Sequence, residues 1–192
     1  MKRNLFIWIP KTSGTSFYRS LSKRDSSFKL ELNPETKIKH GTHGHIKIDL
    51  IYNKEELEEF EIFTIVRNPY SRFISLFEYS KRKDITNIEI DTTIYEFIEL
   101  IEKGIPPVGK YNRDGLSQCN PQVDWIKNVD NVKIYKFEDM CELYSDFNIK
   151  KRWSNKSVFR PYEEYYTPDI KMFVETYYKE DFNLLNYSVR SI

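Results

Sequence analysis

Residues 5–21 decide the fold: Leu5-Phe-Ile-Trp-Ile-Pro-Lys-Thr-Ser-Gly-Thr-Ser-Phe-Tyr-Arg-Ser-Leu21. Leu5 to Ile9 is a continuous apolar, β-rich run, the pattern of a strand covered on both faces in a parallel sheet. Pro10 ends the strand because it has no N–H to donate to a ladder of hydrogen bonds. After a short polar segment, Phe17 and Leu21 give a helix one apolar side. We therefore predict a buried strand, a tight polar loop and an amphipathic helix.

The polar loop is suited to binding an anion such as phosphate or sulfate. A strand that enters a helix through such a loop directs the first N–H groups of the helix, and the positive end of its dipole, at one spot. Gly14 would let the backbone approach a ligand, Lys11 would supply charge, and four hydroxyl groups would donate hydrogen bonds: Thr12, Ser13, Thr15 and Ser16. The alternative is that Thr12 to Ser16 only cap the helix. The loop is not a Walker A loop, because its lysine comes first and only one glycine is present.

A second strand–loop–helix unit follows the apolar run Glu61 to Val66. Asn68 is a good N-cap and Pro69 a good first residue for a helix that we predict to reach Lys83. Arg67 at the strand end and Ser75 on the helix form a second candidate anion clamp. The alternative is that Arg67 pairs with one of the 29 acidic residues of the chain.

The three histidines of the chain fall within six residues: His40, His43 and His45. Three interpretations of this glycine-flanked loop compete. Closely spaced imidazoles can bind zinc, although no Cys, Asp or Glu in the loop completes a tetrahedral set. A histidine can also satisfy only a local hydrogen bond. General-base catalysis is the third, because imidazole titrates near neutral pH and can accept a proton from an attacking hydroxyl.

Both anion motifs resemble those of the sulfotransferases, which move a sulfonate group from 3′-phosphoadenosine-5′-phosphosulfate (PAPS) to a hydroxyl. Pro10-Lys-Thr-Ser-Gly-Thr-Ser16 resembles the 5′-phosphosulfate loop of the carbohydrate branch, which includes the heparan sulfate 2-O-sulfotransferases. Arg67-Asn-Pro-Tyr-Ser-Arg-Phe-Ile-Ser75 resembles the family's 3′-phosphate motif. The order of the two motifs, each after an apolar strand, strengthens the resemblance.

The resemblance implies roles for the residues that match. Lys11 and the segment Thr12 to Ser16 would hold the 5′ group, and Arg67 with Ser75 would hold the 3′-phosphate. His43-Gly-His45 is similar to the catalytic loop of the 2-O-sulfotransferases, so His45 is implied as the base and His43 as its companion at the acceptor. No metal is required, and adenosine 3′,5′-bisphosphate is the implied product.

The composition limits the alternatives. At 192 residues and 23.2 kDa we predict a single domain over residues 1–192. A formal net charge of +1 argues against a general nucleic-acid binder. Leu5 to Ile9 is too short for a signal peptide or a membrane span, and we predict a cytoplasmic protein. Cys119 and Cys141 are isolated thiols, so neither a disulfide framework nor a cysteine metal site is expected.

Together these observations predict an α/β domain with a central parallel sheet flanked by helices and a P-loop-like phosphosulfate site. Its strands would be Leu5 to Ile9, Glu61 to Val66 and Val132 to Phe137, with the cofactor at their carboxyl ends. The predicted function is sulfonate transfer from PAPS to a hydroxyl, most plausibly of a sugar. Two alternatives are a nucleotide-dependent kinase or phosphotransferase, and a catalytically silent nucleotide-binding module. The acceptor and the oligomeric state are left open by the sequence.

Overall fold

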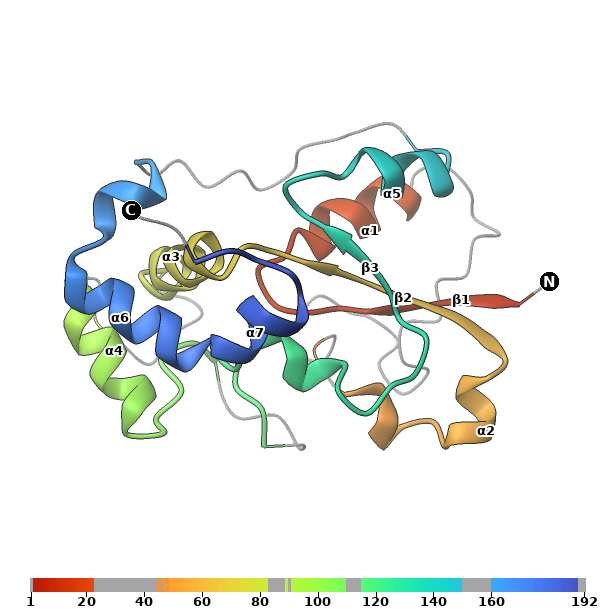
Figure 1. Cartoon of the computed structure of the whole chain (residues 1–192), viewed down its shortest axis with the longest axis horizontal. Helices are drawn as coiled ribbons and strands as arrows, with labels where there is room; N and C mark the ends of the chain where they lie inside the picture. The colour runs from red at the N-terminus through yellow and green to blue at the C-terminus, as the bar shows by residue number, and fades with distance from the viewer. Residues whose placement is uncertain are drawn as a thin grey trace. The chain divides into compact units, whose positions relative to one another are not determined.

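The structure is a computed structural model that describes residues 2–22, 45, 47–82, 89, 91–109, 115–149 and 160–189. The chain divides into two compact units, Met1–Arg67 with Trp125–Lys156, and Asn68–Asp124 with Ser157–Ile192. We call them the sheet unit and the helical unit, and describe each by itself (Figure 1). One domain over residues 1–192 stays a prediction.

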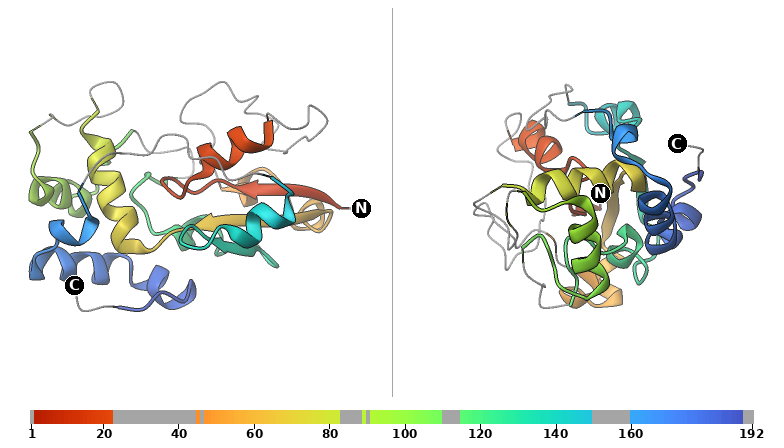
Figure 2. Two further views of the ribbon diagram at one scale, coloured as in Figure 1. Left: turned by 90° about the horizontal axis from the view of Figure 1, so that it is seen from above. Right: turned by 90° about the vertical axis from the view of Figure 1, so that its left-hand side faces the viewer.

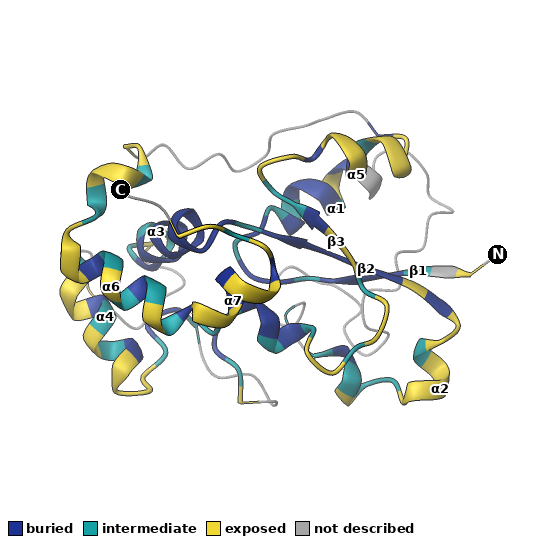
Figure 3. Cartoon of the chain, in the orientation of Figure 1, coloured by how far each residue is buried: buried dark blue, intermediate teal, exposed yellow. Residues whose placement is uncertain are grey.

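The sheet unit is built on three parallel strands in the order β1-β2-β3: β1 (Arg3–Ile7), β2 (Phe60–Val66) and β3 (Lys133–Lys136). Leu5 pairs with Ile62 across the first ladder, and Phe63 pairs with Lys133 across the second. Six of the seven residues of β2 are buried, as expected for a central parallel strand (Figure 3). The predicted parallel α/β sheet is confirmed.

The first strand ends earlier than its apolar sequence predicts. β1 runs from Arg3 to Ile7, whereas we expected Leu5 to Ile9. The carbonyl oxygens of Trp8 and Ile9 lie 2.8 Å from His45 Nδ1 and 2.9 Å from Thr12 Oγ1, respectively. These two carbonyls therefore serve the loop region instead of the ladder, and the chain leaves the sheet while still buried.

Helices cover the sheet through an aromatic core. The sheet unit contains α1 (Gly14–Ser22), η1 (Ile48–Leu50), α2 (Lys54–Leu57) and α5 (Cys141–Asp146). α1 and α5 both lie beside the strands (Figure 2). Phe17 of α1 and Leu143 of α5 are fully buried in one cluster with Phe63 of β2. The ring of Phe147, just after α5, lies 4.7 Å from that of Phe63, centroid to centroid. This core fixes α1, and hence its amino terminus, against the sheet.

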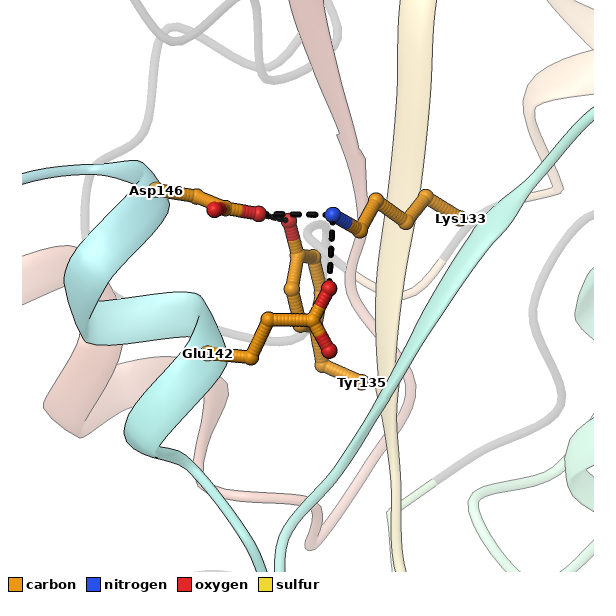
Figure 4. Close-up of polar contacts among 4 residues, drawn as sticks. All are labelled: Lys133, Tyr135, Glu142 and Asp146. Atoms are coloured by element: carbon orange, nitrogen blue, oxygen red, sulfur yellow. Dashed lines mark hydrogen bonds and ion pairs between the residues drawn. The ribbon is translucent and has the colours of Figure 1, made fainter.

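A polar cluster joins α5 to the edge strand β3 (Figure 4). Lys133 Nζ lies 2.7 Å from Asp146 Oδ2 and 2.8 Å from Glu142 Oε1, and the Tyr135 hydroxyl donates to Asp146 at 2.5 Å. The bonds from Lys133 and Tyr135 lower the pKa of Asp146, while partial burial and the bond to Asp146 raise the pKa of Tyr135 to about 12. The ion pairs are solvent-exposed, so we expect them to orient α5 more than to stabilise it.

The helical unit contains α3 (Pro69–Ser80), α4 (Ile94–Glu102), η2 (Gln122–Trp125, whose last residue belongs to the sheet unit), η3 (Tyr162–Tyr165), α6 (Pro168–Tyr177) and α7 (Lys179–Leu184). α3 begins as predicted, with Pro69 at its first position and the Asn68 side chain accepting from Tyr70 N at 3.0 Å. It ends at Ser80, three residues before the predicted Lys83. Among the residues that the structure describes, no helix is long and apolar enough to cross a membrane.

Two buried charged residues hold the segment 117–123 within the helical unit. Arg72 of α3 is 1% exposed and donates to the carbonyls of Gln118, at 2.9 Å, and Asn120, at 3.0 Å. Asp181 of α7 accepts from Gln122 Nε2 at 3.1 Å and from Val123 N at 3.0 Å. Burial raises the pKa of Asp181 against the opposing effect of Arg72. Both charges serve the packing of this segment.

Candidate functional site

The loop between β1 and α1 has an unusual backbone. Lys11 and Ser13 have positive φ angles of 64° and 76°, which residues with a side chain seldom adopt. Each such residue costs about 1–3 kcal/mol and persists only where the surroundings hold it, most often at ligand sites. Here Thr12 supplies one anchor, because it is fully buried and its hydroxyl donates to the Ile9 carbonyl at 2.9 Å. This hydrogen bond therefore helps to hold the loop in its unusual backbone conformation.

The amino terminus of α1 follows directly. The Ser13 carbonyl accepts from Ser16 N at 3.0 Å and from Phe17 N at 3.1 Å, so Gly14 and Thr15 occupy the first turn. Backbone N–H groups at this position of a helix have no acceptor within the helix. They and the helix dipole make the turn an anion-binding terminus. Lys11, Ser13 and Thr15 are half-buried beside it, whereas Gly14 and Ser16 are buried.

Packing against Trp8 gives a reason for a glycine at position 14 that the sequence did not reveal. A Cβ atom at this position would lie 2.2 Å from Nε1 and 2.4 Å from Cδ1 of the Trp8 indole. Contacts this short do not occur, so any larger residue would displace either the indole or the helix terminus. The predicted role of Gly14 in ligand approach stays a prediction, and the close contact with Trp8 is a second constraint on the same residue.

Gly14→Ala is expected to destabilise the protein by about 1–3 kcal/mol, the usual cost of overpacking a tight contact. Urea unfolding of the parent and the variant measures this cost. Trp8→Leu provides the control, because Gly14→Ala should cost less in a chain that lacks the indole. If the alanine costs the same with and without Trp8, the contact with the indole is not the reason for the glycine.

Arg67 lies next to this loop. Its Nη1 is 3.4 Å from the Lys11 carbonyl oxygen, and its Cζ lies 4.5 Å from the centroid of the Phe137 ring. Lys11 follows β1, Arg67 follows β2 and Phe137 follows β3, so three adjacent carboxyl ends of the sheet converge on one guanidinium. The guanidinium of Arg67 therefore lies at the backbone of the loop that contains Lys11. Ser75 lies on α3 in the helical unit, where it is 5% exposed.

His45 also belongs to the sheet unit and approaches the end of β1. Its Nδ1 lies 2.8 Å from the Trp8 carbonyl oxygen, and its own carbonyl accepts from Trp125 Nε1 at 3.2 Å. A carbonyl oxygen only accepts, so Nδ1 carries the proton and, in neutral imidazole, Nε2 carries the lone pair. This is the protonation that a base acting through Nε2 requires. His40 and His43 lie outside the described residues.

Within the ranges that the structure describes, no group of three or more His, Cys, Asp or Glu side chains could hold a metal ion. The zinc interpretation depends on His40 and His43 and so is not addressed by these ranges. The residues that sequence reasoning missed are the aromatic ones around the site: Trp8, Trp125 and Phe137. Trp8 and Phe137 lie within the predicted strands Leu5 to Ile9 and Val132 to Phe137, so the sequence pattern does not distinguish them from core residues.

Comparison with known proteins assigns the chain to a family. The model described as "Sulfotransferase family" matches residues 3–157, which include the loop, Arg67 and His45. The chain belongs to the sulfotransferase family. Membership of this family fits a strand–loop–helix turn that lacks the Walker A pattern. The family match does not distinguish the carbohydrate branch, which the sequence resemblance implies, from other branches of the family.

A solved sulfotransferase shares the fold. A crystal structure of mouse sulfotransferase SULT7A1 complexed with PAP is similar with a TM-score of 0.56 and 16% identity, over 98% of this chain and 90% of that one. A crystal structure of a sulfotransferase from Alicyclobacillus acidocaldarius has a TM-score of 0.48 and 14% identity, over 100% and 98% of the two chains. The search of curated proteins gives no match.

Proposed function

We propose that this chain transfers a sulfonate group from PAPS to a hydroxyl of a carbohydrate, with adenosine 3′,5′-bisphosphate as the second product. The observation that carries the proposal is the distance of 3.4 Å between Arg67 Nη1 and the Lys11 carbonyl oxygen. It places the Arg67 guanidinium beside the loop in which Lys11 and Ser13 have positive φ angles. Membership of the sulfotransferase family supports it. The mouse sulfotransferase of the same fold is complexed with PAP, which is the product proposed here.

The donor would bind through its two anionic ends. The first-turn amides of α1, the Lys11 ammonium and the hydroxyls of residues 12, 13, 15 and 16 would hold the 5′-phosphosulfate. The Thr12 hydroxyl already donates to Ile9, so its contribution would be to accept a hydrogen bond or to keep the loop in shape. Arg67 would bind the 3′-phosphate, and Ser75 is proposed as its partner on the sequence resemblance.

The proposed reaction is an in-line displacement at sulfur. The acceptor oxygen forms a bond to sulfur as the bond from sulfur to the bridging phosphate oxygen breaks, and the electron pair of that bond stays on the phosphate. Lys11 would neutralise the charge that develops there, while His45 Nε2 would take the acceptor's proton. Positioning and charge stabilisation would supply most of the acceleration. His43 is proposed as a partner at the acceptor.

The carbohydrate acceptor rests on the resemblance of His43-Gly-His45 to the 2-O-sulfotransferases, and the cytoplasmic location likewise stays a proposal. A kinase would bind a nucleoside triphosphate through the loop, and a silent binding module would bind the donor without turnover. Both alternatives predict different nucleotide preferences or activities from those of a PAPS-dependent transferase.

Adenosine 3′,5′-bisphosphate is expected to raise the melting temperature more than ATP, ADP or AMP. Only a 3′-phosphorylated nucleotide would satisfy both the Lys11 loop and Arg67. At a hundred times its dissociation constant a ligand stabilises the folded state by about 2.7 kcal/mol, which a thermal shift detects readily. A larger shift with ATP would instead favour the kinase.

Arg67→Ala is the matched variant for this experiment. It removes the guanidinium that is proposed to bind the 3′-phosphate and leaves the Lys11 loop in the chain. The melting-temperature shifts of this variant with the bisphosphate and with AMP should therefore become nearly equal. If the variant keeps the full preference for the 3′-phosphate, Arg67 is not the group that recognises it.

A further inference from the structure

We propose that Trp8 and Trp125 are positioning residues that hold the His45 imidazole as its Nδ1–H tautomer and so direct the Nε2 lone pair to the acceptor. Neither residue lies in the motifs Pro10 to Ser16, His43 to His45 or Arg67 to Ser75. The catalytic consequence rests on the proposed function, whereas the tautomer is a property of the folded chain. Three contacts within the sheet unit carry the inference.

The first contact sets the tautomer. The oxygen 2.8 Å from His45 Nδ1 is a backbone carbonyl, which can only accept, so the ring nitrogen must donate. This carbonyl is available because β1 ends at Ile7, one residue before Trp8. Trp8 is thereby the first residue whose carbonyl lies past the ladder. The early end of the strand thus makes available the carbonyl that sets the protonation of the histidine.

The second contact fixes the backbone of the histidine. Trp125 is fully buried, and a buried indole N–H requires an acceptor. Its acceptor is the His45 carbonyl at 3.2 Å, 80 residues away along the chain. His45 is therefore held at its ring by Trp8 and at its main chain by Trp125. Two such hydrogen bonds limit both the rotation of the imidazole and the drift of the segment that carries it.

The third contact links the histidine to the donor loop. The Trp8 indole lies edge-to-face with the His45 ring, at 5.6 Å between centroids and 81° between planes. The same indole occupies the space that a Cβ of Gly14 would need, at the start of α1. One side chain thus contacts both the proposed base and the anion-binding terminus. The distance between the base and the transferred group would be set through Trp8.

Nitrogen NMR of the parent protein, labelled with ¹⁵N-histidine, tests the tautomer directly. The chain has only three histidines, and His45→Gln identifies the His45 signals by their loss. At a pH where the ring is neutral, we expect Nδ1 to show the shift of a protonated nitrogen and Nε2 that of an unprotonated one. An Nε2–H tautomer at His45 would overturn the proposal, whatever the activity of the protein.

Trp125→Phe then tests the positioning role. It keeps an aromatic ring and removes the N–H, so we expect the two His45 nitrogen shifts to move toward each other and kcat to fall about 10–100-fold, the range for groups that orient a functional histidine through hydrogen bonds. The KM for the donor should stay within about twofold, since the phosphate ligands are untouched. Trp8→Phe keeps the carbonyl and should therefore keep the tautomer.

Tyr178→Phe in the helical unit is the control, because it also deletes a buried donor to a backbone carbonyl, that of Cys119 at 2.8 Å. It should leave the His45 signals as in the parent. A folded Trp125→Phe protein with the parent's shifts and kcat would overturn the role of Trp125. Absence of sulfonate transfer in the parent, with the expected tautomer present, would count against the proposed function and leave the positioning of His45 supported.

Discussion

Replacing Lys11 with glutamine is expected to lower kcat by about 10²–10³-fold, equivalent to about 2.7–4 kcal/mol of transition-state stabilisation. The bridging oxygen gains its full negative charge only as the sulfur–oxygen bond breaks. A cation at that oxygen therefore stabilises the transition state more than the bound donor. Affinity for adenosine 3′,5′-bisphosphate should fall by a smaller factor than kcat. Steady-state kinetics and titration calorimetry measure the two quantities.

Glutamine is preferred to alanine here because it retains part of the side-chain length of Lys11 while it removes the charge. Lys11→Arg should recover part of the rate, since it restores a cation of different shape. Lys54→Gln is the control for the loss of a positive charge, because Lys54 is 77% exposed on α2, which packs near the beginning of β2. If Lys11→Gln reduces affinity and kcat equally, Lys11 is a binding residue only.

The strands and the anion loop could be predicted because their signals are local. Continuous apolar runs mark buried parallel strands, and the observed β2 begins one residue before the predicted Glu61 and ends at the predicted Val66. Arg67 could be placed near Lys11 by one further rule, that parallel strands bring their carboxyl ends to one edge.

The partners of single polar groups could not be predicted in this way. The sequence favours ligand-binding hydroxyls at residues 12, 13, 15 and 16, yet the Thr12 hydroxyl donates to a backbone carbonyl three residues earlier. Short hydroxyl side chains make such local bonds as readily as they bind ligands, and composition does not separate the two. The bond between Trp125 and His45 joins residues 80 positions apart, so no periodicity or motif contains it.

The motif Arg67 to Ser75 contains residues with different tasks. Arg67 lies at the anion loop, whereas Arg72 is buried in the helical unit and donates to the carbonyls of Gln118 and Asn120. Sequence resemblance treats both arginines as parts of one phosphate motif. Burial separates them, because a buried arginine whose guanidinium donates to two backbone carbonyls stabilises a loop. Motif membership thus points to a candidate site and does not divide its residues into ligands and supports.

His45→Gln is expected to retain binding of adenosine 3′,5′-bisphosphate and to lose about 10²–10⁴-fold in kcat, the range for a general base. Glutamine can still donate a hydrogen bond to the Trp8 carbonyl, but it has no basic nitrogen to accept the proton of the acceptor. In the parent, kcat should rise with pH as the imidazole loses its proton, and the variant should lack this rise. Binding by calorimetry and pH–rate profiles of both proteins measure the effects.

The same experiment separates the three interpretations of the histidine loop. A chelator should leave the parent's rate unchanged, because the proposed transfer needs no metal, and His43→Gln should lower kcat less than His45→Gln does. A rate that is lost on chelation and restored by zinc would favour a metal site formed with His40 and His43. Full activity in His45→Gln would contradict the assignment of the base. It would also leave the tautomer that we infer from the contact with the Trp8 carbonyl without a catalytic role.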